Sequence, residues 1–343
     1  MKSKRLVALT AALFGVFTPL LQAADIPTVR VSLFSWPGYG FWFIAKEKNL
    51  APDLTFDIQI IEDPYESYAQ MTAGKLDVTS STSEYGPIAA DAATGVKLVS
   101  YTNPSTGTDK IIVAPGVADV AGLKGKQVAV LEGGLTQIFM AMWLEKNGVK
   151  FNEVQYVNVV MDDAVAAMVS GKVAAAEYWE PFGGQVLKSL KGSRVLATSA
   201  EPEWLKTGLL GDGMYMATAF LEKKPEIARK TMKAYWDAVA WWKMNPEEGN
   251  QIIAKAIQFE VADVEDVIGK GTRAGIHVFD LSEAAKFMGV MPGEPPLGMA
   301  NGQINEHWKI TSDWWLKFGL TQKTHPLEAG ISLEPLKSLA TAQ

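Results

Sequence analysis

In this 343-residue chain, the side chains best suited to bind a charged ligand are carboxylates in or beside the loops around short apolar segments. The acids expected to converge are Glu84, Asp109, Glu132, Glu180 and Asp212. Lys110 is the nearest basic residue, and it is expected to face away from Asp109 because neighbouring strand side chains point to opposite faces. A carboxylate that leaves water without a cationic partner is costly. The pattern therefore predicts a site for a small solute that carries positive charge.

Aromatic rings accompany these acids at Trp36, Tyr39, Tyr85 and Trp179. The face of such a ring attracts a cation by about 0.5–2 kcal/mol. Core packing is the alternative, and it applies most to residues 41–43, which continue into a helix. Acids and rings together favour a cationic or amine-bearing solute. Candidates are a guanidine- or amidine-like compound, a zwitterion such as taurine, or a planar nitrogen heterocycle.

Hydroxyl groups and backbone N–H groups are also available to this solute. The hydroxyls of Ser81, Ser83 and Thr136, and the N–H groups of residues 133–137, could bind an acceptor on it. If residues 177–180 stay extended, Glu177 and Glu180 point to opposite faces, and Glu180 is preferred because Pro181 marks the strand end. For each acid, a solvated loop residue or a helix cap is the simpler alternative.

The elements that must position these side chains alternate between strand and helix. Strands are predicted over 27–33, 56–61, 76–79 and 97–101, with a helix over 40–49 and another opened by Asp63 and Pro64. This is repeated β-α-β with a polar loop after each strand. It predicts an open, largely parallel α/β sheet, in which ligands bind beyond the carboxyl ends of the strands.

A second block of the same kind begins near residue 111. Residues 71–76 (MTAGKL) parallel residues 168–173 (MVSGKV) as a helix end, a glycine cap and a strand start, although two βα units can match by chance. We expect lobe I over 24–109, lobe II over 110–211, and a return to lobe I with C-terminal helices over 212–343. Crossings near 108–112 and 208–215 would form a two-strand hinge beside a cleft.

The first residues have the pattern of a secretory signal. Lys2, Lys4 and Arg5 precede an apolar run, and Ala23 is suited to cleavage; an uncleaved anchor is the alternative. No later run is apolar enough to cross a bilayer. The chain has no cysteine, so it can form neither a disulfide nor a cysteine-linked lipid anchor. We expect residues 1–23 to be removed and the mature chain to be a free monomer in the periplasm.

Charge and length restrict the function further. The chain has 32 basic and 38 acidic residues, and removal of Lys2, Lys4 and Arg5 leaves 29 basic residues and a net charge of −9. An acidic, unclustered surface argues against nucleic acid and against anionic membranes as partners. A mature length of about 320 residues exceeds what one core organises, which again indicates two lobes.

Catalysis is the competing class of function. The three histidines, His277, His307 and His325, are isolated from one another. Without cysteine there is no thiol nucleophile and no thiolate metal site, and Gly133-Gly134 lacks the Lys-Ser/Thr of a phosphate loop. We therefore expect no catalytic residue, cofactor or metal. A sensor module is a third possibility, but such modules are usually fused to a membrane span.

The order of several short motifs resembles the substrate-binding proteins of ABC transporters, in the nitrate/sulfonate/taurine group. The motifs are WPGYG at 36–40, AKEK at 45–48, AGKLDV at 73–78, GTDKIIV at 107–113, LKGKQVA at 123–129 and WEP at 179–181. No single motif is specific, but their order and spacing cover nearly the whole mature chain.

The resemblance implies a type II periplasmic-binding-protein fold with a cleft that closes on one small-molecule solute. It also implies docking of the closed form on a membrane permease with a cytoplasmic ATPase. The group is named for anions, so an aliphatic sulfonate or nitrate is an alternative ligand, and a pyrimidine is another. A related pyrimidine-synthase family does chemistry on this fold, but inside the cell, which the signal segment argues against.

Overall fold

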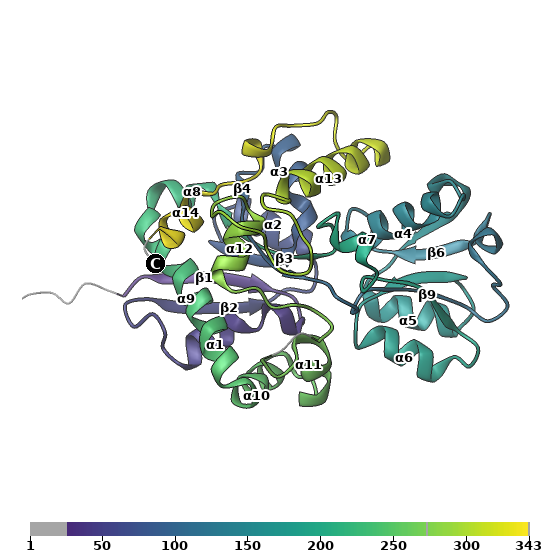
Figure 1. Ribbon diagram of the computed structural model, residues 1–343, viewed down its shortest axis with the longest axis horizontal. Coiled ribbons are helices and arrows are strands. Elements are labelled where there is room, and N and C mark those ends of the chain that lie inside the picture. Colours follow the sequence, from purple (N-terminus) through teal and green to yellow (C-terminus); the bar gives the residue numbers. More distant parts are fainter. Residues whose placement is uncertain (1–25, 272–273, 342–343) are drawn as a thin grey trace, which may run out of the picture.

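Two α/β lobes stand side by side, each built on a five-stranded sheet (Figure 1). The computed structural model describes residues 26–271 and 274–341. The predicted signal segment, residues 1–23, lies outside the described residues. In the part of the chain that is described, no helix is both long enough and apolar enough to cross a membrane.

The first sheet has the strand order β2-β1-β3-β10-β4. Its strands are β1 (Thr28–Leu33), β2 (Thr55–Ile60), β3 (Val78–Thr82), β4 (Val96–Pro104) and β10 (Gly211–Ala217). β1 is parallel to β2 and β3, whereas β10 is antiparallel to β3 and β4. The antiparallel β10 brings Asp212 beside Thr82 and Asn103, at the carboxyl ends of their strands.

The second sheet repeats this arrangement with the order β7-β6-β8-β5-β9. Its strands are β5 (Lys110–Val113), β6 (Gln127–Val130), β7 (Gln155–Asn158), β8 (Ala175–Tyr178) and β9 (Arg194–Thr198). β6 is parallel to β7 and β8, and β5 is antiparallel to β8 and β9. In each sheet the antiparallel strand is the one that enters from the other lobe.

Helices cover both faces of each sheet. The helices that precede the second sheet in the chain, or follow the return of the chain to the first lobe, are α1 (Phe41–Glu47), α2 (Pro64–Thr72), α3 (Gly86–Asp91), α8 (Thr218–Lys223), α9 (Pro225–Met244), α10 (Pro246–Ile257), α11 (Val261–Ile268), α12 (Leu281–Phe287), α13 (Ile304–Phe318) and α14 (Glu334–Ala340). Those of the second lobe are α4 (Leu135–Lys146), α5 (Met161–Val169), α6 (Phe182–Ser189) and α7 (Pro202–Leu205). Short 3-10 turns are η1 (Pro37–Tyr39), η2 (Ser83–Tyr85), η3 (Val120–Leu123), η4 (Phe151–Glu153) and η5 (Leu327–Ala329).

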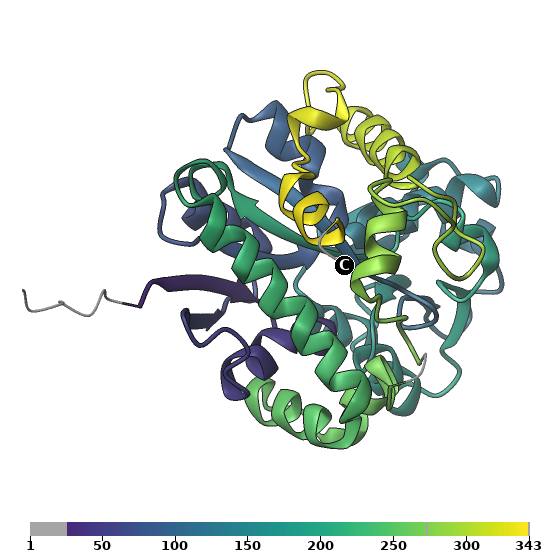
Figure 2. The same cartoon turned by 60° about the vertical axis from the view of Figure 1, so that its left-hand side comes forward.

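Local sequence explains where these elements begin. The Asp63 side chain accepts a hydrogen bond from the Tyr65 N–H at 2.8 Å, and Pro64 occupies the first turn of α2, as predicted. The long α9 buries the ring of Trp242 and that of Tyr235 against α1 and lies across the first lobe (Figure 2). These contacts place α9 on the first lobe, beside α1.

The chain crosses between the lobes twice. It leaves β4 at Pro104 and enters β5 at Lys110, then returns from β9 through α7 to β10. The two crossing segments are hydrogen-bonded to each other, since the Ser105 N–H donates to the Leu210 carbonyl at 2.8 Å. The predicted type II fold with a two-strand hinge is confirmed, with one difference: each sheet carries an antiparallel strand.

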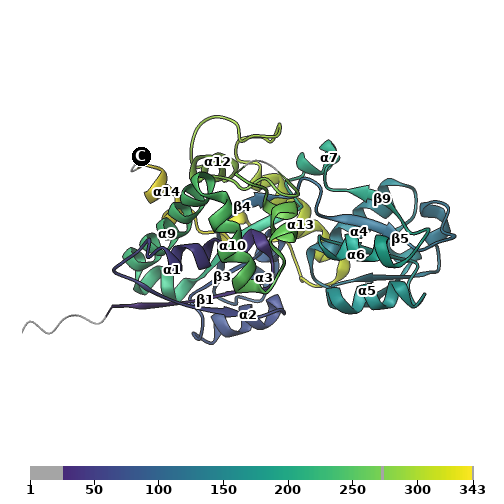
Figure 3. The same cartoon turned by 90° about the horizontal axis from the view of Figure 1, so that it is seen from below.

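A third link between the lobes was not predicted. The C-terminal half of α13 packs against the second lobe, where the buried Trp315 ring joins the cluster around Phe139 and Trp204. The Lys317 ammonium lies 2.6 Å from the Glu145 carboxylate of α4. Figure 3 shows α13 at the junction of the two lobes.

Candidate functional site

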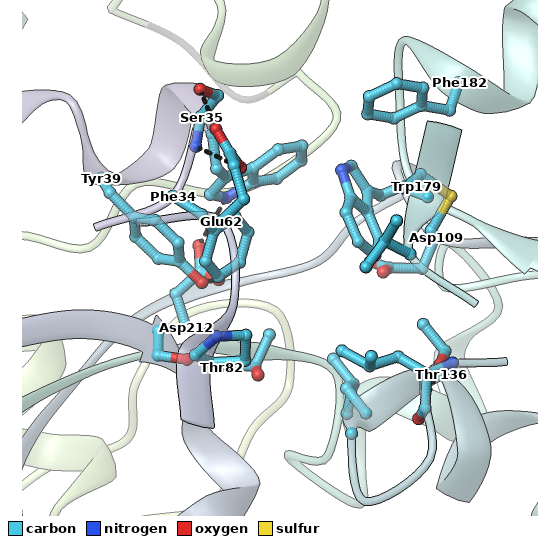
Figure 4. Close-up of a pocket in the computed structure, with 18 of the residues that line it drawn as sticks. Phe34, Ser35, Tyr39, Glu62, Thr82, Asp109, Thr136, Trp179, Phe182 and Asp212 are labelled. Carbon is cyan, nitrogen blue, oxygen red and sulfur yellow. Dashed lines mark hydrogen bonds between the residues drawn. The ribbon is translucent and has the colours of Figure 1, made fainter. Parts of the chain in front are cut away.

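A cavity of about 1020 Å³ lies between the lobes. Figure 4 shows its two walls, with Tyr39, Glu62 and Asp212 on one side and Asp109 and Trp179 on the other. The first wall is formed by η1, by the end of β3 and by β10. The second is formed by the start of β5, the loop before α4 and the loop after β8. The loops at the carboxyl ends of strands therefore meet in one cleft, as expected for this sheet topology.

Asp212 is the acid of the first wall that accepts the most side-chain hydrogen bonds. Its carboxylate accepts hydrogen bonds from Tyr39 Oη at 2.8 Å, Trp36 Nε1 at 3.0 Å and Asn103 Nδ2 at 3.2 Å. A carboxylate has about four acceptor positions, so one remains for a ligand. Burial outweighs these donors and raises the pKa of Asp212 to about 7.

Glu84 is the second buried acid of this wall. Its Oε1 accepts a hydrogen bond from Thr82 Oγ1 at 2.9 Å, and its carbonyl accepts one from Trp315 Nε1 at 2.8 Å. Its Oε2 is buried and has no hydrogen-bond partner in the described structure. Burial raises the pKa of Glu84 to about 7, although the hydrogen bond from Thr82 acts in the opposite direction.

Asp109 is the buried acid of the second wall. Its Oδ2 accepts a hydrogen bond from Thr108 Oγ1 at 3.1 Å. Behind it lies Glu177, which is 2% exposed and does not line the cleft. Burial raises the pKa of both groups, and that of Glu177 lies well above its usual range.

No basic side chain among the described residues lines the cleft. The acidic lining residues are Glu62, Asp63, Glu84, Asp109, Glu132, Asp163, Asp212, Glu260 and Asp263. The nearby Lys110 is bound to Glu180, with 2.5 Å between Nζ and Oε1. The site therefore concentrates negative charge and offers no cation to a ligand.

Aromatic side chains form the remainder of the walls. The ring centroids of Phe34 and Trp179 lie 6.2 Å apart across the cleft, with the ring planes tilted by 45°. Trp36 and Tyr39 are 5% and 1% exposed, and their N–H and O–H groups bind Asp212. These two side chains therefore hold the carboxylate with their polar edges, whereas the sequence pattern predicted that their ring faces would contact a solute.

A hydrogen bond joins the lobes at one edge of the cleft. Tyr65 Oη on α2 donates to the Gly133 carbonyl of the second lobe at 2.8 Å. Gly133 has a φ of +76°, and a Cβ at this position would lie 2.2 Å from Tyr65 Oη. The glycine is thus required both by its backbone conformation and by the close approach of the tyrosine.

The cleft brings together ten of the eleven predicted site residues. Those that line it are Trp36, Tyr39, Ser81, Glu84, Tyr85, Asp109, Glu132, Thr136, Trp179 and Asp212. Glu180 does not line it, because its carboxylate is bound by Lys110 and by the Gly184 N–H at 2.9 Å. Contact of any of these residues with a ligand stays a prediction.

Several details of the site were missed or assigned differently. The Thr136 hydroxyl accepts a hydrogen bond from the Leu131 N–H at 2.8 Å, so it is used within its own loop. Ser83 does not line the cleft and is bound to His307 Nε2 at 2.8 Å. Asn103 and Tyr65 were not predicted as site residues. Asn103 follows the same rule as Glu84, a polar side chain at a strand's carboxyl end, and could have been found by it.

Two lobes, a two-segment hinge and a cleft between them define the bilobal architecture of periplasmic solute-binding proteins. The family described as "NMT1/THI5 like" matches residues 36–249, and the chain belongs to this family. A binding protein of Brucella abortus (strain 2308), so named only provisionally, is 26% identical over 273 residues, covering 77% of this chain and 82% of its own.

Solved structures show the same fold. The alkanesulfonate-binding protein SsuA of Xanthomonas axonopodis pv. citri, bound to MOPS, has a TM-score of 0.68 at 17% identity, covering 88% of this chain and 97% of its own. The periplasmic aliphatic sulphonate binding protein SsuA of Escherichia coli has a TM-score of 0.68 at 19% identity, covering 89% and 97%. The resemblance to ABC-transporter substrate-binding proteins of the nitrate/sulfonate/taurine group is confirmed.

The same fold also carries chemistry in another protein. The desulfurization enzyme DSZB has a TM-score of 0.61 at 14% identity, covering 92% of this chain and 100% of its own. The fold by itself therefore does not separate a binder from an enzyme. The relative and the two SsuA proteins described above are named as binding proteins.

Proposed function

We propose that this protein captures a small cationic or amine-bearing, nitrogen-containing solute for an ABC importer. The observation that carries the proposal is the charge of the cleft: nine acidic side chains line it, and no described basic side chain does. Three of these acids, Glu84, Asp109 and Asp212, are at most 9% exposed. Buried carboxylates without a cation are unfavourable, and a cationic solute supplies the missing charge.

Unpartnered acceptors favour a solute that is rich in N–H groups. Ser81 Oγ, Glu84 Oε2 and Asn103 Oδ1 are buried in the lining without a hydrogen-bond partner in the described structure. A guanidinium or amidinium group donates hydrogen bonds in its plane and accepts none. Its faces are suited to rings such as Phe34 and Trp179. A guanidine- or amidine-like solute therefore fits this wall better than taurine, whose sulfonate must find donors.

An anion is the second candidate, and one observation favours it. Both SsuA structures are named as sulfonate-binding proteins, and one of them holds MOPS. A helix N-terminus such as that of α4 is also a general site for anions. In this chain, however, the buried Glu84 carboxylate lines the same cleft as that helix terminus. A bound sulfonate or nitrate would meet Glu84 and Asp212 with no compensating cation. A pyrimidine is a further alternative, which the acceptors and rings could accommodate.

The remaining partners follow from the class of protein. The loaded form is proposed to dock on a membrane permease with its ATPase, as a periplasmic monomer without a catalytic role. Ser83 and His307 are hydrogen-bonded, but both are nearly fully buried and lie outside the cleft lining. A hydroxyl that no substrate can reach does not support the enzyme alternative.

Isothermal titration at pH 7.5 with a panel of solutes tests the proposal. The panel contains guanidinium, acetamidinium, methylammonium, taurine, methanesulfonate, nitrate and a pyrimidine. Binding of guanidinium or acetamidinium with at least tenfold higher affinity than the anions is expected. Tight binding of methanesulfonate or nitrate, with no heat from the cations, would show that the charge argument is wrong.

A further inference from the structure

We infer that Glu177 is a neutral positioning residue, which carries a proton and donates it in a hydrogen bond to Asp109. Asp109 is thereby held as the anionic group of the second wall. The inference rests on the proposed function, because it is the cationic solute that Asp109 would face. Glu177 lies behind the cleft wall and does not line the cleft, so its role cannot be read from solute contacts.

Strand register places the two carboxyl groups together. Glu177 on β8 is paired with Ile111 on β5, and Asp109 is two residues before Ile111, so both acids lie on the same face. Asp109 lines the cleft, and Glu177 does not. Diagonal neighbours on one face of paired strands lie within reach of each other's side chains, and both of these acids are buried. Glu177 can therefore affect solute binding only through its effect on Asp109.

The hydrogen-bonding of Glu177 is incomplete if it is ionised. Both of its carboxyl oxygens are buried and accept no hydrogen bond from any donor in the described structure. Asp109, by contrast, accepts one from Thr108 Oγ1. Two adjacent buried carboxylates do not both ionise, and the proton resides on the one with fewer donors. A proton on Glu177 gives it a donor and gives Asp109 a second hydrogen bond.

The surrounding charges are consistent with this assignment. The charged groups that act on Glu177 are Asp109, which raises its pKa, and Lys110, which lowers it. Lys110 lies on the adjacent strand position and is already bound to Glu180 at 2.5 Å. Burial is the largest influence and raises the pKa of Glu177 further.

Two substitutions separate a proton donor from a source of charge. Glu177→Gln keeps an N–H donor for Asp109 and has no charge, so guanidinium affinity is expected to stay within about twofold of wild type. Glu177→Leu keeps the approximate volume but has no donor, so affinity is expected to fall about fivefold or more. Asp109→Asn is expected to lose at least tenfold. Titration calorimetry with guanidinium chloride at pH 7.5 measures all three.

A measurement without solute tests the proton directly. A raised native pKa gives stability that is present below the unfolded value and is lost as pH rises. Thermal unfolding of the solute-free protein between pH 5 and 9 should therefore show a steeper loss of Tm in wild type than in Glu177→Gln. Infrared difference spectra of the two proteins at pH 7.5 should show the carbonyl band of a protonated carboxylic acid in wild type.

The outcomes are distinct. A tenfold loss of guanidinium affinity in Glu177→Gln with an unchanged Tm would mean that Glu177 supplies charge, and would overturn the inference. Equal pH slopes in wild type and Glu177→Gln, without the acid band, would overturn it as well. If wild type binds no cation at all, the proposed function fails. The unfolding and infrared measurements would then still decide whether Glu177 carries the proton.

Discussion

Asp212 and Glu84 are carboxylic acids in a buried environment, where the ionised form is unfavourable. Both are buried, and both have a pKa raised to about 7 by that burial. Near neutral pH each is thus close to the point where it loses its proton. A positively charged solute stabilises the ionised form, so solute binding and proton release are coupled at these two residues.

Replacement of Asp212 tests its role in binding the solute. Asp212→Asn removes the charge and places an amide N–H group among the donors from Trp36, Tyr39 and Asn103. A hydrogen bond to a charged group contributes about 1.5–3 kcal/mol, so guanidinium affinity should fall about 10- to 100-fold by calorimetry.

The matched control is Asp163→Asn, at an exposed acid of the cleft lining. Exposed charges are screened by water, so this variant should change affinity less than about twofold. Equal effects of the two substitutions would mean that the cleft acts through its overall charge. No effect of Asp212→Asn, with a preserved Tm, would remove Asp212 from the binding site.

At the scale of residues, the sequence predicted which loops supply the acids but not how each acid is bound. Glu84, Asp109 and Asp212 follow from their positions beside strands. The pairing of Lys110 with Glu180 does not, because residues 110 and 180 become neighbours only when β5 and β8 pair antiparallel. The same pairing buries Glu177 behind Asp109, so the preference for Glu180 over Glu177 had the wrong physical basis.

Among the elements, α2 and the loop before α4 are joined by the hydrogen bond from Tyr65 to Gly133. Their residues belong to different lobes, so this contact exists only when the lobes are close. Tyr65→Phe removes the hydroxyl and leaves the ring. A neutral hydrogen bond contributes about 0.5–1.5 kcal/mol, so solute affinity should fall about 2- to 10-fold. Stopped-flow fluorescence should assign the change to faster dissociation.

Tyr156→Phe is the control for this variant. The Tyr156 hydroxyl lies in the second lobe, outside the cleft lining, and has no hydrogen-bond partner in the described structure. Its removal should leave affinity and dissociation rate unchanged. An unchanged dissociation rate in Tyr65→Phe would show that the tyrosine does not hold the lobes together.

At the scale of elements, periodicity and caps located most strands and helices to within a few residues. The first strands of lobe I and the capped start of α2 are examples. The antiparallel direction of β5 and β10 was not predicted, because direction depends on which lobe a strand enters from. The contact of α13 with the second lobe was also missed, since Trp315 and Trp204 are brought together only by the tertiary fold.

For the molecule as a whole, four buried acids with raised pKa values affect stability. Glu84, Asp109, Glu177 and Asp212 bind protons more tightly in the native state than when unfolded. Their contribution is fully present below their unfolded pKa values, near 4, and is lost as pH rises through their native pKa values. The solute-free protein should therefore lose unfolding free energy between pH 5 and 8 in urea titrations.

A cationic solute should offset this loss, because it binds the native state with ionised acids. The increase of Tm caused by guanidinium at about 10 mM, well below denaturing concentrations, should be larger at pH 8 than at pH 5.5. Sodium chloride at the same concentration is the control for ionic strength. A smaller increase at pH 8 would contradict the linkage between the solute and the buried acids.

The pH dependence of solute affinity tests the central claim most directly. If one buried carboxylate with a pKa of about 7 must ionise before a cation binds, the guanidinium Kd should decrease about tenfold between pH 6 and pH 8. Calorimetry in buffers of different ionisation enthalpy should show net proton release on binding at pH 6.5. A Kd that increases with pH, or proton uptake on binding of methanesulfonate with high affinity, would contradict the account and identify the cleft as an anion site.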